Sequence, residues 1–183
     1  MAPIVQDNAT TRTVALGAGT WYPLWGAAIS VDGGADGSEI NASASTLDIP
    51  AFVPAGTLLV LWPDGVDTTQ SAAARPSVLT AAEVGDDREV WLWPGTAVNA
   101  EVGRWHDEHG AAEAPTWTWS GRAVDSAPAS ATWNGAPLAL TVTTDAVVAT
   151  VVGDGTLAFA GGGSLVIARG HPAAQVTVRL AVR

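Results

Sequence analysis

Four consecutive residues, His106, Asp107, Glu108 and His109, carry side chains that commonly bind divalent metal ions. On a helix, His106 and His109 would point to one side. The residues that follow are small and acidic and end in Pro115, which predicts a loop, and the His-Glu-x-x-His spacing of zinc proteases is absent. We therefore expect a solvated acidic linker here and no metal site.

A second acidic segment, residues 32–39, is rich in Gly and has some features of a calcium-binding loop. An EF-hand loop supplies oxygen ligands from its first, third and fifth positions and a Glu from its twelfth. With Asp32 as the first position, the third is Gly34 and the twelfth is Ser43. The segment is therefore expected to be a loop tip without calcium.

The chain lacks the residues on which most covalent and phosphate chemistry depends. It contains no Cys and no Lys, which excludes thiolate nucleophiles, thiolate metal sites and the lysine-containing phosphate-binding loop. The Gly-x-Ser-x-Gly turn of the α/β-hydrolases is absent, and the third His, His171, stands far from the other two. We expect no catalytic residues, no cofactor and no enzymatic activity.

The aromatic residues are mostly of one type, with nine Trp against two Phe and one Tyr. Trp is enriched in binding interfaces because it combines a large apolar area with one N–H donor. On a strand, Trp117 and Trp119 would share a face at a spacing of about 7 Å. Together with Trp133 they form a candidate platform for stacking on sugar rings; the alternative is that these rings fill a β core.

The net charge is −10, with 18 acidic residues and eight Arg. A surface of this sign repels phosphate backbones, and the Arg are scattered along the chain, so we expect no binding to nucleic acid. No run of apolar residues is long enough for a membrane-spanning helix. We expect no association with a membrane.

Turn-forming residues divide the chain into short segments, because 20 Gly and 11 Pro leave few stretches long enough for a helix. The sequence predicts a mainly β protein with a flexible N-terminal arm (1–13), a β-rich module with long loops (14–106), a linker (107–115) and a small immunoglobulin-like β-sandwich (116–183). The expected strands are Thr11–Leu16, Thr46–Ile49, Gly56–Trp62, Arg88–Trp93, Ala97–Val102, Thr116–Trp119, Ala131–Trp133, Leu138–Thr144, Ala146–Val152, Thr156–Ala160, Ser164–Arg169 and Gln175–Val182.

Two of the expected strands, around residues 58–62 and 90–93, are apolar on both faces. A strand with one face in water should show polar residues on that face. Either these strands are central in a two-sided core, or one face meets another subunit. We predict a subunit interface that contains Trp62, Trp91 and Trp93.

Two segments, 49–59 and 88–102, resemble the head decoration proteins of lambda-like tailed phages. Those proteins combine a proline, a small residue and Gly-Thr-Leu at the start of a strand, here Pro54 to Leu58, with a later strand, a Gly-Thr turn and a short acidic stretch. The likeness covers part of the chain. The family's Gly-rich strand between the two segments is not evident here, and the C-terminal module is additional.

This resemblance implies a phage virion structural protein, made in the host cytoplasm and seated on the outer surface of the capsid. As a capsid decoration protein it would stabilise the head by binding the major capsid protein across capsomers. The resemblance also implies a homotrimer, and an N-terminal arm containing Ile4 and Val5 that adds a strand to the capsid protein. The alternative is a carbohydrate- or surface-binding β module of a tail or fibre adhesin.

Overall fold

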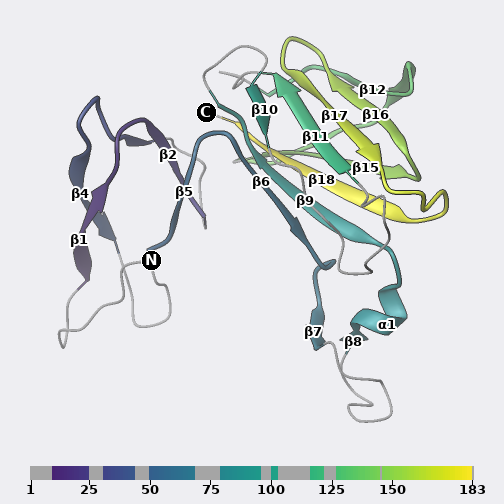
Figure 1. Cartoon of the computed structure of the whole chain (residues 1–183), viewed down its shortest axis with the longest axis horizontal. Helices are drawn as coiled ribbons and strands as arrows, with labels where there is room; N and C mark the ends of the chain where they lie inside the picture. The colour runs from purple at the N-terminus through teal and green to yellow at the C-terminus, as the bar shows by residue number, and fades with distance from the viewer. Residues whose placement is uncertain are drawn as a thin grey trace.

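The computed structural model describes residues 10–24, 31–43, 50–68, 79–95, 100–102, 116–121, 127–144 and 146–182. Strands dominate these residues (Figure 1), and the helix among them, α1 (Ala81–Val84), has four residues. The mainly β fold predicted from the sequence is therefore confirmed. Within the described ranges, no helix has the length and apolar character needed to cross a membrane.

Two sheets packed face to face form a β-sandwich, on the right of Figure 1. The first sheet has six strands, in the order β10 (Ala100–Val102), β11 (Thr116–Gly121), β17 (Gly163–Ala168), β16 (Gly155–Phe159), β12 (Ala131–Trp133) and β13 (Ala136–Leu138). The second has five strands, in the order β14 (Thr141–Val142), β15 (Ala146–Val152), β18 (Gln175–Ala181), β9 (Arg88–Trp93) and β6 (Thr57–Leu61).

One hydrophobic core fills the space between the two sheets. Alternate residues of β18 point into it, and Val176, Val178 and Leu180 are at most 1% exposed. The six-stranded sheet contributes the two largest side chains, Trp117 and Trp119. The remaining members of this core come from strands of both sheets: Leu58, Val60, Val90, Leu92, Ala131, Val147, Ala149, Val151, Leu157, Phe159, Leu165 and Ile167.

The sandwich takes its strands from both sides of the predicted linker. β9 and β18 are distant in sequence, yet they pair in parallel from Arg88 to Leu92. β6 then pairs with the other edge of β9 in the antiparallel direction. The predicted division into modules 14–106 and 116–183 therefore does not match the sheets, because the C-terminal strands share one sheet with β6 and β9. The predicted linker 107–115 lies outside the described residues.

Polar contacts fix the start of β18 beside the start of β9. A side-chain oxygen of Asp87 accepts a hydrogen bond from the backbone N–H of Gln175 at 2.7 Å. Nearby, Nδ1 of His171 lies 3.0 Å from a carboxylate oxygen of Asp86. No local sequence pattern indicates that segments so far apart in the chain will pair, so the sequence did not predict these contacts.

The expected single strand Leu138–Thr144 is divided between the two sheets. β13 ends at Leu138 in the six-stranded sheet, and β14 begins at Thr141 in the five-stranded sheet. The chain crosses from one layer of the sandwich to the other at Ala139 and Leu140, which interrupt the expected strand.

The N-terminal part forms two small sheets beside the sandwich, on the left of Figure 1. β1 (Thr11–Leu16) and β4 (Ser38–Ser43) pair as an antiparallel ribbon. The other sheet has the order β3 (Val31–Asp32), β2 (Thr20–Pro23) and β5 (Phe52–Pro54). Of the predicted arm 1–13, residues 11–13 belong to β1 and residues 1–9 lie outside the described ranges, as does the expected strand 46–49.

A third small sheet joins β7 (Val66–Thr68) to β8 (Leu79–Thr80), directly before α1. Glu83 caps this helix: one of its carboxylate oxygens accepts hydrogen bonds from the backbone N–H and the hydroxyl of Thr80, at 2.8 and 2.9 Å. The helix is thus a single capped turn.

The turn between β12 and β13 follows the local sequence closely. Asn134 and Gly135 have φ angles of 50° and 83°, the left-handed values that a two-residue type I′ hairpin requires. The side-chain oxygen of Asn134 also accepts a hydrogen bond from the backbone N–H of Thr156 at 2.8 Å. The Asn-Gly pair therefore both closes the hairpin and holds it against β16.

The sandwich depends on one close approach between strands β11 and β17. A Cβ atom at Gly163 would lie 2.8 Å from Cζ2 of Trp119 and closer still to the backbone of Ser120. We expect Gly163→Ala to lower the free energy of unfolding by about 1–3 kcal/mol, as overpacked sites do. Urea unfolding followed by tryptophan fluorescence measures this loss.

Gly17→Ala is the matched control, since a Cβ there meets nothing closer than 3.6 Å. Its effect should stay within about 0.5 kcal/mol. Equal stability of the two variants would show that Trp119 does not pack against β17 as described.

Candidate interaction surfaces

The aromatic residues predicted to bind sugars are buried. Trp117 and Trp119 are 0% and 1% exposed and point into the sandwich core. The Trp119 ring tilts against Phe159 with 6.2 Å between ring centroids, and the guanidinium of Arg169 lies 5.0 Å from the Trp117 centroid. A ring enclosed on all sides cannot stack on a glycan, so the predicted platform is wrong.

Trp133, the third residue of that platform, is half-buried and packs on the edge of the same core from the β12 hairpin. The other two residues of the predicted platform are buried, so neither is an exposed partner with which Trp133 could form a stacking surface. The structure instead shows the alternative that the sequence left open, in which these rings fill a β core.

The two apolar faces of β9 are both covered within the chain. Val90 and Leu92 point into the sandwich core, while Trp91 and Trp93 point to the opposite side. There Trp93, 4% exposed, packs with the fully buried Tyr22 of β2. The remaining side chains of this second cluster are Leu24, Val53, Ala55, Leu59 and Ala181.

This second cluster explains why β9 lacks a polar face. Trp91 and Trp93 meet edge to face, with 5.8 Å between ring centroids. The hydroxyl of Tyr22 donates to the backbone oxygen of Pro94 at 3.4 Å, which ties the N-terminal sheet to the end of β9. A face covered by its own chain is not free for another subunit, so the predicted interface at Trp93 is overturned.

Two other residues of the predicted interface have different positions. Trp62 is half-buried at the end of β6, where its ring stacks on the guanidinium of Arg88 at 3.9 Å. Trp91 donates from its indole nitrogen to Glu89 at 2.6 Å, and Arg179 lies 5.4 Å from its ring centroid. Ile4 and Val5 lie outside the described residues.

The structure separates the charges of the protein. Arg88 and Arg169 are buried, at 4% and 6% exposure, each over a Trp ring. By contrast, many of the acidic side chains are exposed, among them Asp32, Asp36, Glu39, Asp64, Glu83 and Asp154. The described surface is therefore more acidic than the count of charges alone indicates.

Of the two candidate metal segments, the structure describes the one that begins at Asp32. The Asp32 carboxylate accepts a hydrogen bond from the backbone N–H of Gly34 at 2.8 Å, which closes a turn between β3 and β4. His106 and His109 lie outside the described residues. In the part of the chain that the structure describes, no three His, Asp or Glu side chains gather closely enough to hold a metal ion.

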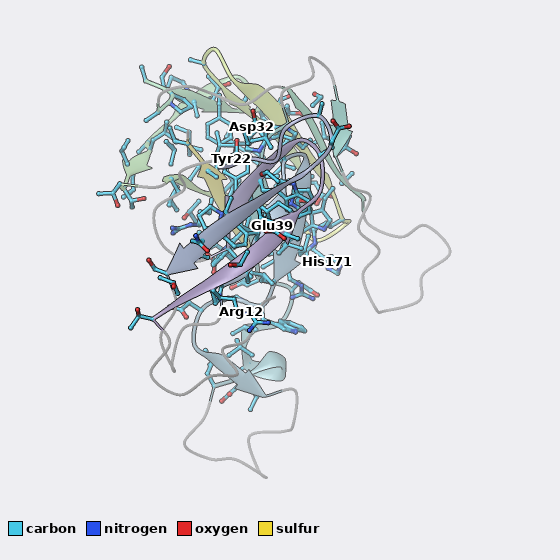
Figure 2. All side chains as sticks on the ribbon, turned by 90° about the vertical axis from the view of Figure 1, so that its left-hand side faces the viewer. Arg12, Tyr22, Asp32, Glu39 and His171 are labelled. Atoms are coloured by element: carbon cyan, nitrogen blue, oxygen red, sulfur yellow. The ribbon has the colours of Figure 1, made fainter. Side chains whose placement is uncertain are left out.

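The β1–β4 ribbon is the part of the molecule that stands furthest from the sandwich (Figure 1), and Figure 2 shows it in front, with Glu39 near its middle and Arg12 toward one end. Each strand has six residues, about 20 Å of extended chain. Within the described ranges each strand pairs only with the other, so both outer edges are open.

The ribbon has two unlike faces. One face is exposed and largely polar, with Thr11, Thr13, Ala15, Glu39, Asn41 and Ser43. The other face is apolar at its centre, where Val14 stands opposite Ile40, and both are half-buried. Sequence reasoning predicted β1 but missed β4 and hence the ribbon, because Ser-Glu-Ile-Asn-Ala-Ser has low β propensity.

No known protein-family profile matches the chain, and no curated protein sequence matches it. Among solved structures, the chain is similar to an uncharacterized protein, lmo2446, from Listeria monocytogenes EGD-e, with a TM-score of 0.55 and 17% sequence identity. The alignment covers 95% of this chain and 17% of that much longer protein. At this identity the similarity shows the fold alone.

The contact between the N-terminal sheet and β9 can be tested at Trp93. Because its ring is buried against Tyr22, we expect Trp93→Ala to lower the free energy of unfolding by about 3–5 kcal/mol. Chemical denaturation measures the stability, and light scattering of the folded variant measures its molecular mass.

Val152→Ala is the control, since Val152 is 55% exposed on β15 and its truncation should leave the stability within about 0.5 kcal/mol of the native value. A Trp93→Ala protein of native stability and reduced mass would instead place this residue between subunits.

Proposed function

We propose that this protein is a structural protein of a tailed-phage virion, a decoration protein that binds the outer surface of the capsid across capsomers. The observation that carries the proposal is the β1–β4 ribbon, which reaches away from a well-packed sandwich and has no further strand partner among the described residues. The resemblance of segments 49–59 and 88–102 to phage decoration proteins supports the same role.

An isolated two-stranded ribbon is marginally stable in water, and its unpaired N–H and C=O groups readily accept a further strand. In this role the ribbon adds to the sheet of a capsid subunit by strand addition. The half-buried pair Val14 and Ile40 supplies apolar area on one face of that junction, and the backbone supplies its hydrogen bonds. The sandwich stays outside as a rigid body.

The distribution of charge fits a site on the outside of a capsid. A surface rich in exposed carboxylates, with Arg88 and Arg169 withdrawn over Trp rings, repels nucleic acid and so suits a position away from the packaged DNA. The mechanical role is to bury surface across the seams between capsomers, so that internal pressure must break these contacts before the shell opens.

Trimeric seating at local threefold positions belongs to the same proposal and rests on the resemblance. Its contacts would come from surfaces other than the Trp93 face, which the N-terminal sheet covers.

Co-sedimentation with capsid shells tests the proposal. Expanded shells of the phage that encodes this chain, stripped of decoration, should pull the purified protein into the pellet up to a saturating ratio. Thr13→Pro should abolish this binding, because proline in the centre of β1 removes a backbone N–H and disrupts the ribbon. Near-UV circular dichroism of the variant should still show a folded sandwich.

Val166→Ser, an exposed change on the six-stranded sheet, should bind like the native protein. If the native protein stays in the supernatant at every shell concentration, the proposed role is wrong. If Thr13→Pro binds as well as the native chain, the ribbon is not the docking element.

A further inference from the structure

The hairpin between β12 and β13 is held to β16 by one residue, Asn134, through two hydrogen bonds. Its backbone N–H donates to the carbonyl oxygen of Thr156 at 2.9 Å, and its side-chain oxygen accepts from the backbone N–H of Thr156 at 2.8 Å. The side-chain amide of Asn134 thus takes the place that a backbone carbonyl has in a regular antiparallel ladder.

A notch on β16 receives this amide group. Gly155 has no side chain, and a Cβ atom there would lie 2.8 Å from Cγ of Asn134 and closer still to its Oδ1 and Nδ2. Any side chain at position 155 would therefore displace the amide. The glycine is needed here for space, so that the amide can lie flat against the strand.

Asn134 is followed by Gly135, and both residues are exposed at the tip of the turn. In an Asn-Gly pair the backbone nitrogen of the glycine attacks the side-chain Cγ readily, because glycine has no Cβ to hinder the approach. The nitrogen gives its proton to hydroxide and bonds to Cγ, the bond from Cγ to Nδ2 breaks, and ammonia leaves with a proton from water. Water then opens the resulting succinimide ring to aspartate or isoaspartate.

The folded hairpin keeps the two reacting atoms apart. The φ angles of Asn134 and Gly135 are 50° and 83°, which are those of a type I′ turn, and the first central residue of such a turn has ψ of about 30°. At this ψ the nitrogen of Gly135 lies nearly opposite Cβ of Asn134 across the Cα–C bond, whereas closure of the ring requires both on the same side. The bond to Thr156 and the notch at Gly155 hold the amide away as well.

We propose that Asn134 is a deamidation site that is closed in the folded hairpin and becomes reactive only when the hairpin separates from β16. Separation releases the amide from Thr156 and allows ψ of Asn134 to rotate, and attack by Gly135 follows. Local openings of this kind occur in native proteins without global unfolding. Because the ammonia is lost to solvent, the modification records each productive opening of this edge of the six-stranded sheet.

The two products differ in their effect on the fold. Aspartate at position 134 keeps a side-chain oxygen that accepts from the N–H of Thr156, so it fits the closed hairpin. Isoaspartate continues the chain through the former side chain, which adds one atom to the backbone of a two-residue turn. The pairing of Trp133 with Ala136 then does not re-form in register, and the hairpin stays altered.

This site is separate from the β1–β4 ribbon, since β12 lies on the opposite side of Figure 1 from β1 and β4. The reaction requires only water and hydroxide. It therefore does not depend on the proposed role on a capsid, and failure of either proposal leaves the other unaffected.

Peptide mass spectrometry after incubation at mildly alkaline pH tests the proposal. Deamidation at Asn134 should be at least about tenfold slower in the native protein than in the chain unfolded by guanidinium chloride, because two hydrogen bonds must break before the attack. In the unfolded chain, Asn134 should react faster than Asn8, Asn41 and Asn99, each of which precedes an Ala. Equal rates at Asn134 in the native and unfolded chains would overturn the proposal.

Gly155→Ala tests the notch without changing the reacting pair. The added methyl group should displace the amide of Asn134 and raise its deamidation rate severalfold, toward that of the unfolded chain. Gly17→Ala, where a Cβ atom meets nothing closer than 3.6 Å, is the matched control and should keep the native rate. A Gly155→Ala protein that is folded by near-UV circular dichroism and deamidates at the native rate contradicts the proposal. The comparison of native and unfolded chains remains decisive if this variant does not fold.

Amide hydrogen exchange at Thr156 provides a second measurement on the native chain, because this N–H donates to Asn134. The same opening exposes the amide of Thr156 and releases the side chain of Asn134. Raising the temperature should therefore accelerate both reactions by more than it accelerates them in the unfolded chain. Deamidation that keeps its unfolded-chain temperature dependence while exchange at Thr156 does not would show that attack occurs in the closed hairpin, against the proposal.

Discussion

The burial of both faces of β9 is the constraint on which the rest of the structure depends. Val90 and Leu92 on one face complete the core between the two sheets, and Trp91 and Trp93 on the other hold the N-terminal sheet. A strand that is apolar on both sides must be covered on both sides, since about 25 cal/mol is lost for each Å² of apolar surface left in water. The chain meets this requirement by placing β9 between β6 and β18 and folding β2 and β5 across the outer face.

Trp and Arg act together in this arrangement. Rings fill the core at Trp117 and Trp119, and three guanidinium groups lie over Trp rings, at Arg88, Arg169 and Arg179. Such pairs let a large ring and a cation share a partly dry environment at modest cost. Their consequence for function is electrostatic, because positive charge is drawn toward the interior while carboxylates remain on the surface.

The described residues leave strand edges open at two places, one in the N-terminal part and one in the sandwich. The N-terminal ribbon and the edge of β6 are both places where backbone hydrogen-bonding groups lack a strand partner among the described residues. They differ in chemistry: the ribbon has one polar face and one face that is apolar at its centre, whereas β6 is mostly apolar.

The sequence by itself determined the class of the fold and most of its strands. Thr11–Leu16, Arg88–Trp93, Ala131–Trp133 and Ala146–Val152 have the bounds expected from turn residues and β-branched runs, because these signals are local. The alternation of apolar and polar residues along β18 divides its side chains into two faces, and the structure buries the apolar one. Only the tertiary structure decided what covers the second face of β9 and whether Trp117 and Trp119 point inward or outward. The sequence of an apolar strand indicates that it must be buried, but not which segment will cover it. The parallel pairing of β9 with β18 joins segments that are far apart in the chain, and no local sequence pattern encodes that proximity.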